Sequence, residues 1–188
     1  MGSEKRKQYV YHIKQPDMTG QVLYPLNRLR DVHPDAFARH VKKYEGREWL
    51  LSISVPPLNC LWNDVLHFSL MHPNVPYRAL VSAGFTQHQK PRDWYRVPLE
   101  DVIGKPAVLY LNTRVLSDTR QLLPSDFEPV TASRAEELSE MPERNLEYYR
   151  SAFKAGEQPL VYKRAPHFFL KADLDVSDYT VLNWQDEP

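Results

Sequence analysis

The first stretch with a clear pattern of apolar and polar residues is residues 8–14 (QYVYHIK). Aromatic and aliphatic side chains alternate there with polar ones, which predicts a β-strand. In a strand, alternate side chains point to the same face, so His12 shares a face with Val10. Residues 22–29 (VLYPLNRL) predict a short extended piece that Pro25 interrupts.

From Pro34 the period of the pattern becomes helical. Proline suits the first turn of a helix, and Phe37, Val41 and Tyr44 then form one apolar stripe. Gly46 is a typical residue just after a helix end. We therefore expect a helix from Pro34 to about residue 45.

The segment that follows departs from simple patterns. Residues 49–55 predict a second strand, which Pro56 ends, but the next stretch (NCLWNDVLHFSLMHP) mixes large apolar residues with Asn63, Asp64 and His67. If it is extended, neither of its faces is cleanly apolar. Local rules fail most often at functional sites, so we expect functional residues here.

Helical patterns return further along the chain. Residues 76–83 predict a short helix that Gly84 ends. Ser133 and Glu136 have the spacing of a capping box, and the helix they open is interrupted at Pro142 and continues to about residue 156. The expected buried side chains of this helical region are Leu138, Leu146, Tyr149 and Phe153.

The remaining strand candidates lie in the second half of the chain. They are residues 108–112 (VLYLN), 159–163, 167–171 and 179–184. With helices in the middle and strands at both ends, the chain predicts an α+β fold. Its central mixed or antiparallel sheet is formed by N- and C-terminal strands and flanked by helices.

Length and composition predict one domain in residues 8–188, after a polar segment, residues 1–7, that is a frayed tail or an expression remnant. Lys plus Arg number 24 and Asp plus Glu number 24, so a nucleic-acid partner needs a local basic patch. The single cysteine, Cys60, and the lack of a secretory leader indicate a cytoplasmic protein. No apolar run approaches the roughly 20 residues that cross a bilayer, so we expect no membrane partner.

The sequence lacks the motifs of several classes of enzyme and binding site. The glycines are too scattered for a phosphate-binding loop, and no serine or Cys60 lies in the glycine-flanked turn of a hydrolase. His12, His67, His72 and His167 lie on or beside strand-like segments, but their spacing is not that of a zinc site, and no metal is predicted. These histidines are the main candidates for chemistry.

The end of the first predicted helix reads KKYEGRE. In the structural interpretation, Lys42, Lys43 and Arg47 stabilise the negatively polarised C-terminal end of the helix, and this alone explains their presence. In the functional interpretation, Arg47 binds a phosphate through its fork of donors, and Tyr44 offers an aromatic face to a base or a nicotinamide.

Taken together, these segments resemble the ADP-ribosyltransferase fold, in particular the DarT-type toxins that modify nucleic acid. The resemblance lies in the order of a strand with Tyr-His-Ile, a helix ending in KKYEGR, a polar and aromatic central segment, and a closing strand pair (HFFLKADLDVSDYTVLNW). It covers most of the chain, and its motifs are individually unspecific.

The resemblance implies NAD as a substrate and a nucleic acid or a protein as acceptor. It places His12 at the nicotinamide ribose and Arg47 at the cofactor. The glutamate expected on the later strand is replaced, since the matching place reads Ala-Pro-His and holds His167. A neutral imidazole can act as a base but lacks the full negative charge of a carboxylate. Asp64 is a substitute acid from another strand.

Three hypotheses follow. The first is an ADP-ribosyltransferase-like enzyme with His12, Tyr44, Arg47 and Asn63 on NAD and with His67, His167 or Asp64 as catalytic groups. The second is an adaptor domain that binds a protein or a nucleotide without turnover. The third is a nuclease or RNA-modifying domain with two histidines as acid and base. The transferase hypothesis also predicts that His12 and His167 lie in one pocket. Side chains of His12 and His167 on opposite faces of the sheet would contradict it.

Overall fold

The structure is a computed structural model that describes residues 7–85, 90–114, 116 and 120–188. Residues 1–6 of the predicted tail lie outside these ranges. The described residues form a seven-stranded sheet in which all neighbours are antiparallel, so the α+β prediction is confirmed. In spatial order its strands are β11 (Thr180–Asn183), β6 (Asp93–Pro98), β1 (Tyr9–Ile13), β5 (Leu66–Ser69), β9 (His167–Leu170), β7 (Ala107–Tyr110) and β8 (Phe127–Glu128).

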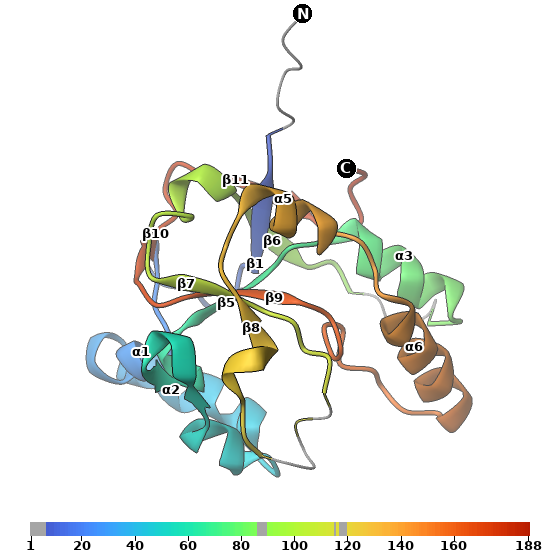
Figure 1. Ribbon diagram of the computed structural model, residues 1–188, viewed down its shortest axis with the longest axis horizontal. Helices are drawn as coiled ribbons and strands as arrows, with labels where there is room; N and C mark the ends of the chain where they lie inside the picture. Colours follow the sequence, from blue (N-terminus) through green and yellow to red (C-terminus); the bar gives the residue numbers. More distant parts are fainter. Residues whose placement is uncertain (1–6, 86–89, 115, 117–119) are drawn as a thin grey trace, which may run out of the picture.

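Helices surround this sheet (Figure 1). Helices α3 and α6 lie side by side at one end of the molecule, and α1 and α2 pack together at the other. The α-helices are α1 (Leu26–Val32), α2 (Pro34–Val41), α3 (Asn74–Ser82), α5 (Ala132–Glu137) and α6 (Glu143–Ala155). The 3-10 helices are η1 (Lys42–Tyr44), η2 (Glu48–Ser52), η3 (Pro56–Leu58), η4 (Trp62–Asp64), η5 (Leu99–Asp101) and η6 (Pro124–Asp126). Two small sheets pair β2 (Val22–Leu23) with β10 (Leu174–Asp175) and β3 (Ser54–Val55) with β4 (Cys60–Leu61).

The pleat of the sheet separates two apolar faces. Val10, Phe68 and Phe168 belong to one core cluster, which α5 and the β2–β10 pair cover. On the opposite face, one cluster packs under α3 and α6 and another under α1, η1 and η2. The strands are buried on both faces, which is why their apolar residues alternate less cleanly than those of a half-exposed sheet.

The sheet is split between β1 and β5. All five residues of β1 pair with β6, and all four of β5 pair with β9, but the two strands share the single register pair of Tyr11 with Ser69. On either side of this pair the strands diverge. The gap between β1 and β5 therefore widens on both sides of the Tyr11–Ser69 pair. The candidate residues His12 and His67 lie on these two strands.

Helix α6 confirms the predicted restart after Pro142, and it ends at Gly156, whose φ is 69°. Tyr149 is fully buried, as expected, but Phe153 is 48% exposed, so its predicted core position is wrong. Its ring instead lies over Gly84, where an added Cβ would come within 2.5 Å of a ring carbon. The start of α5 also differs from the prediction, because Thr131, not Ser133, accepts the capping hydrogen bond from the Arg134 amide.

Other expectations were wrong. Of the strand predicted over residues 49–55, only Ser54–Val55 (β3) form a strand, and residues 49–52 belong to the 3-10 helix η2, whose Leu50 is buried in the cluster under α1. Residues 159–163 form no strand, since residues 161–163 lie in a turn, and the supposedly extended residues after Pro25 form α1. Strand β6 was missed, although it pairs with both β1 and β11. Within the described ranges, no helix combines the length and apolar character needed to cross a bilayer.

Candidate functional site

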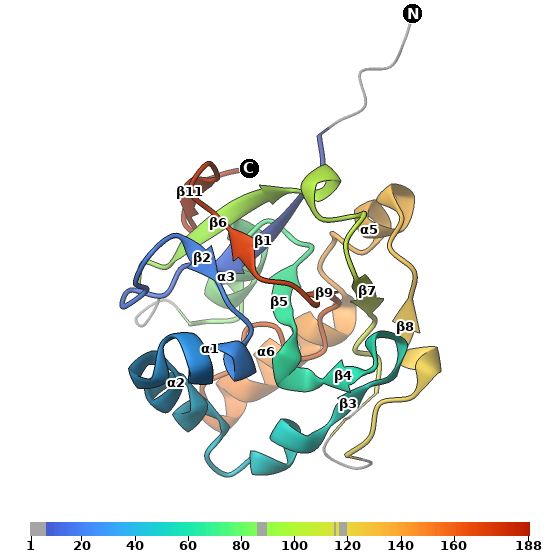
Figure 2. The same ribbon diagram turned by 90° about the vertical axis from the view of Figure 1, so that its left-hand side faces the viewer.

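A cavity of about 370 Å³ lies where β1 and β5 diverge below the Tyr11–Ser69 pair. Four parts of the chain line it: residues 12–19, 22–29, 33–50 and 62–67, each with gaps. Figure 2 shows α1 and α2 below β2 and beside β5, where they form one wall. The cavity is therefore assembled from the first third of the chain.

Two prolines shape this wall. Pro25 holds an extended backbone (φ −53°, ψ 149°) directly before α1 begins. His33 then leaves helical geometry, with φ −140° and ψ 73°, and Pro34 starts α2 at its first position. The chain thus turns between two short helices, and the side chains of Leu26, Leu29 and Ala36 reach the cavity.

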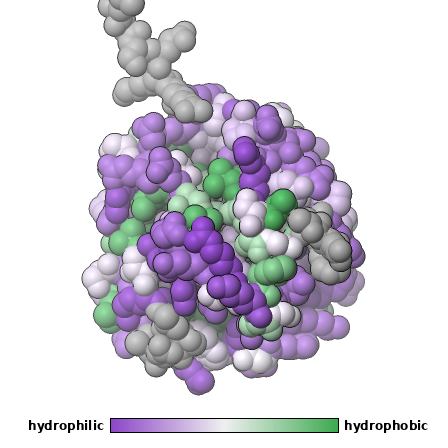
Figure 3. Space-filling model, turned by 90° about the vertical axis from the view of Figure 1, so that its right-hand side faces the viewer, coloured by the Kyte–Doolittle hydropathy of each residue, from purple (hydrophilic) through white to green (hydrophobic). Residues whose placement is uncertain are grey.

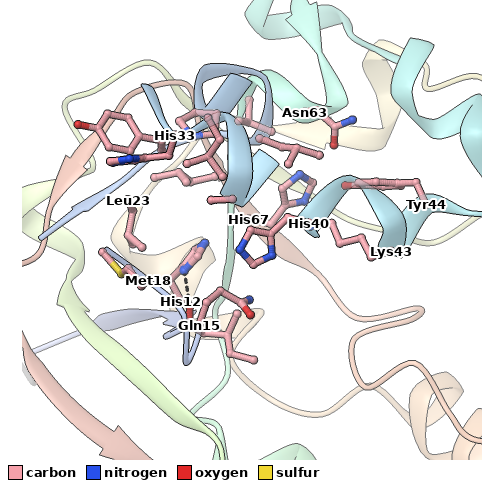
Figure 4. A pocket seen from close by; sticks show the side chains of 18 of the residues that line it. His12, Gln15, Met18, Leu23, His33, His40, Lys43, Tyr44, Asn63 and His67 are labelled. Atoms are coloured by element: carbon pink, nitrogen blue, oxygen red, sulfur yellow. Dashed lines mark hydrogen bonds between the residues drawn. The ribbon is translucent and has the colours of Figure 1, made fainter. Parts of the chain in front are cut away.

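Five of the seven predicted site residues line this one cavity, and Figure 4 labels all of them except Arg47. They are His12, Tyr44, Arg47, Asn63 and His67. Because they come from β1, η1, η4, β5 and the turn after η1, only the folded chain brings them together. This set includes every residue that the NAD hypothesis assigns to the cofactor.

Two histidines of the cavity, His12 and His67, have defined tautomers. His12 Nδ1 lies 2.8 Å from the carbonyl oxygen of Ile13, and His67 Nε2 lies 3.0 Å from that of Trp62. A carbonyl only accepts, so these nitrogens carry the hydrogens and donate. The other nitrogen of each ring, His12 Nε2 and His67 Nδ1, is left with a lone pair.

Both rings are neutral near pH 7. Burial lowers the pKa of His12 to about 4. Burial also lowers the pKa of His67 well below its ordinary value, and the nearby His167 adds to this effect. Each ring therefore offers a hydrogen-bond acceptor, as a ribose hydroxyl requires, and neither is an acid at neutral pH.

Asn63 adds a buried hydrogen-bond donor to the lining of the cavity. It is only 2% exposed, and its side-chain nitrogen Nδ2 is buried without a hydrogen-bond partner in the described part of the chain. Native proteins pair nearly all such donors, because an unpaired one costs about 1–3 kcal/mol. A ligand oxygen or ring nitrogen in the cavity would supply the acceptor.

The charged groups of the cavity are mainly cationic. Lys43 and Arg47 line it, and the Lys43 ammonium lies 5.1 Å from the centre of the Tyr44 ring. Asp17 is the one carboxylate among the described lining residues, and it is already paired with Arg39 and His40. Lys43 and Arg47 thus have no carboxylate partner within the described part of the chain, and they suit an anionic ligand.

Arg47 also has the structural role considered above. Its Nη2 donates a 2.9 Å hydrogen bond to the carbonyl of Lys43, at the end of the first helical region. The guanidinium has further donors, so this bond does not prevent it from binding a phosphate.

Asp64 and His167 are the two predicted site residues outside the described lining. The Asp64 carboxylate accepts 2.7 Å hydrogen bonds from Asn27 Nδ2 and from the Leu61 amide. The first bond ties α1 to η4 and the second caps η4, so the carboxylate of Asp64 has a structural role.

The prediction that His12 and His167 share a pocket is wrong. Tyr11, Ser69 and His167 are paired in register and share a face, so His12, the neighbour of Tyr11, points to the other face. His167 instead packs among Tyr110, Tyr162 and Phe169, with its ring centre 6.3 Å from that of His67, and its Nδ1 donates to the Ala165 carbonyl. His12 and His67 line the same cavity although they belong to opposite faces, because the cavity lies in the gap between β1 and β5. His167 does not line it.

Several lining residues were not expected from the sequence. They include Lys43, His33 and His40, so four of the seven histidines of the chain face one cavity. The only sequence signal was the position of Lys43 next to Tyr44 in KKYEGR. Among the described residues, no group of three or more His, Cys, Asp or Glu side chains has an arrangement that could hold a metal ion.

Comparisons with protein-family models, with curated proteins and with solved structures gave no match for this chain. Function is therefore inferred below from the cavity itself.

Proposed function

We propose that the cavity binds NAD, as the resemblance to the ADP-ribosyltransferase fold implies. The version of the transferase hypothesis that uses both His12 and His167 is contradicted, because their side chains lie on opposite faces of the sheet, so any transfer of ADP-ribose would depend on His67. The observation that carries this proposal is the unpartnered amide of Asn63 in a cavity that also presents two unpaired cations. A dinucleotide has phosphates for the cations, ring and carboxamide acceptors for the amide, and ribose hydroxyls for acceptor nitrogens.

Each residue has a part in this binding. Lys43 and Arg47 contact the pyrophosphate, and the Tyr44 ring lies against a base or the nicotinamide. His12 Nε2 accepts from a ribose hydroxyl, as the resemblance implies for the residue on the first strand. The apolar wall of Leu26, Leu29 and other aliphatic side chains excludes water from the bound ligand.

Transfer of ADP-ribose would break the bond between nicotinamide and the ribose C1′ and form a bond from C1′ to the acceptor. The acceptor's proton would pass to the lone pair of His67 Nδ1. The low pKa of His67 makes it a weak base, and Asp17 is engaged in ion pairs. The site therefore supports binding more directly than transfer, and the two steps need separate tests.

The alternatives fit the cavity less well. A histidine acid and base pair needs one protonated ring, whereas burial keeps both His12 and His67 neutral. A protein adaptor needs an extended apolar surface. On the face with α3 and α6, Figure 3 shows hydrophobic residues in separate small patches between hydrophilic ones.

The test compares two adjacent lysines. Both side chains are exposed, but Lys43 lines the cavity and Lys42, its neighbour on η1, does not. Calorimetric titration with NAD should show that Lys43→Ala weakens binding by about fivefold or more, while Lys42→Ala leaves it unchanged, because only one ammonium faces the phosphates.

A second variant separates the two roles of Arg47. Arg47→Ala should weaken NAD binding by about tenfold and cost less than about 1 kcal/mol of stability. Equal binding by all three variants, or no binding by the wild type at millimolar NAD, would refute the proposal. Incubation with labelled NAD and DNA, RNA or protein acceptors then tests transfer, and binding without transfer would support the adaptor hypothesis for a nucleotide.

A further inference from the structure

A second cavity, of about 430 Å³, lies at the opposite end of the split between β1 and β5. Gln8 and Tyr9 line it from the start of β1, and Leu70 and His72 line it from the residues after β5. The single Tyr11–Ser69 pair thus stands between two cavities. None of the NAD candidates faces this second one.

Arg96 enters this cavity from β6. Its guanidinium lies 3.8 Å from the centre of the Tyr9 ring, which holds its plane in place. Its Nε is buried without a hydrogen-bond partner, and no ion pair of Arg96 occurs among the described residues. An oriented guanidinium without a carboxylate partner is suited to a planar oxyanion.

Two more lining residues offer hydrogen-bonding groups to a ligand: Gln8 offers an acceptor and His72 a donor. Gln8 Nε2 donates to Glu136 at 3.3 Å, which leaves Oε1 buried without a partner. His72 Nδ1 accepts from the Asn74 amide at 3.2 Å, so the neutral ring carries its hydrogen on Nε2. Burial and the charge of Arg96 hold the pKa of His72 below its ordinary value, which keeps the ring neutral.

The rim of the cavity carries negative charge. Glu136, Asp186 and Glu187 are exposed and line it, together with one rim cation, Lys7, which is already paired with Glu100 at 3.0 Å. These carboxylates disfavour a doubly charged phosphate and favour a ligand that also has a positive group.

We propose that this cavity binds an amino acid or a similar small zwitterion, with its carboxylate on Arg96 and its ammonium group toward Gln8 Oε1 and the acidic rim. The fork of Arg96 pairs with both carboxylate oxygens, and the ammonium group supplies the donor that Gln8 lacks. This site is independent of NAD binding.

The test titrates the ¹⁵N-labelled full chain with glycine, L-leucine and L-phenylalanine, and with acetate and inorganic phosphate as anions that lack an ammonium group. The Arg96 Nε–Hε signal should shift in a saturable way with at least one amino acid. Acetate should need a concentration about tenfold higher, because it cannot reach Gln8.

Variants identify the residues involved. Arg96→Gln and Gln8→Leu should each weaken binding of that amino acid by about tenfold or more, judged by calorimetry and by unchanged thermal melts. If Arg96→Gln does not fold, Gln8→Leu and the Arg96 signal of the wild type still decide the question. Arg92→Gln is the matched control, because Arg92 also stacks on an aromatic ring, Trp184, but does not line the cavity.

Three results would overturn the proposal. The first is no saturable shift with any of the amino acids up to about 10 mM. The second is binding of acetate or phosphate as tight as that of the best amino acid. The third is an equal loss of binding in Arg92→Gln.

Discussion

Replacing Asn63 by leucine should make the protein more stable and its ligand binding weaker. Leucine has nearly the same size but no donor, so the substitution removes the cost of a buried unpaired Nδ2. That cost is about 1–3 kcal/mol, and we expect a gain at the lower end of this range, about 1 kcal/mol. The same change removes the donor proposed to contact NAD and should weaken binding at least about tenfold.

Asn74→Leu is the matched control for this prediction. Asn74 is as buried as Asn63, at 3% against 2%, but its Nδ2 donates a 3.1 Å hydrogen bond to the Trp184 carbonyl, and it does not line the NAD cavity. Its replacement should therefore cost about 1–3 kcal/mol and leave NAD binding unchanged. Urea unfolding gives the stabilities and calorimetry the affinities. If Asn63→Leu is destabilising and binds NAD normally, the amide is structural and the reasoning fails.

Two further predictions concern stability. The pKa of His12 and of His167 is about 4 in the folded protein, against about 6.5 when unfolded. The unfolded chain therefore binds more protons between these values, and stability should fall with pH below 6.5, by up to about 3 kcal/mol for each ring at pH 4. Urea melts across this range should show a smaller fall in His167→Phe, and an equal fall would show that this ring titrates normally. In α6, Tyr149→Ala should cost roughly 3–5 kcal/mol and Phe153→Ala less than about 1.5, because only the first ring is fully buried; similar losses in denaturant melts would contradict this.

The sequence pattern alone determined the elements whose period is clear. Strand β1, the helix from Pro34 and the restart after Pro142 were all predicted, because alternation, proline and glycine act on the nearest residues. Residues 49–55 and β6 were not, because packing against distant segments decides whether such short stretches coil or extend.

The residue types of the candidate site were also evident from the sequence. Polar and aromatic residues clustered at KKYEGR and NCLWND, and five of the seven candidates line one cavity. Their grouping was decided by the tertiary structure. His12 lies with His67 and apart from His167, because the pleat sends neighbouring side chains of a strand to opposite faces and the split between β1 and β5 joins those faces at one end. The pairing register that creates this split depends on contacts between residues 11 and 69, and no local pattern encodes it.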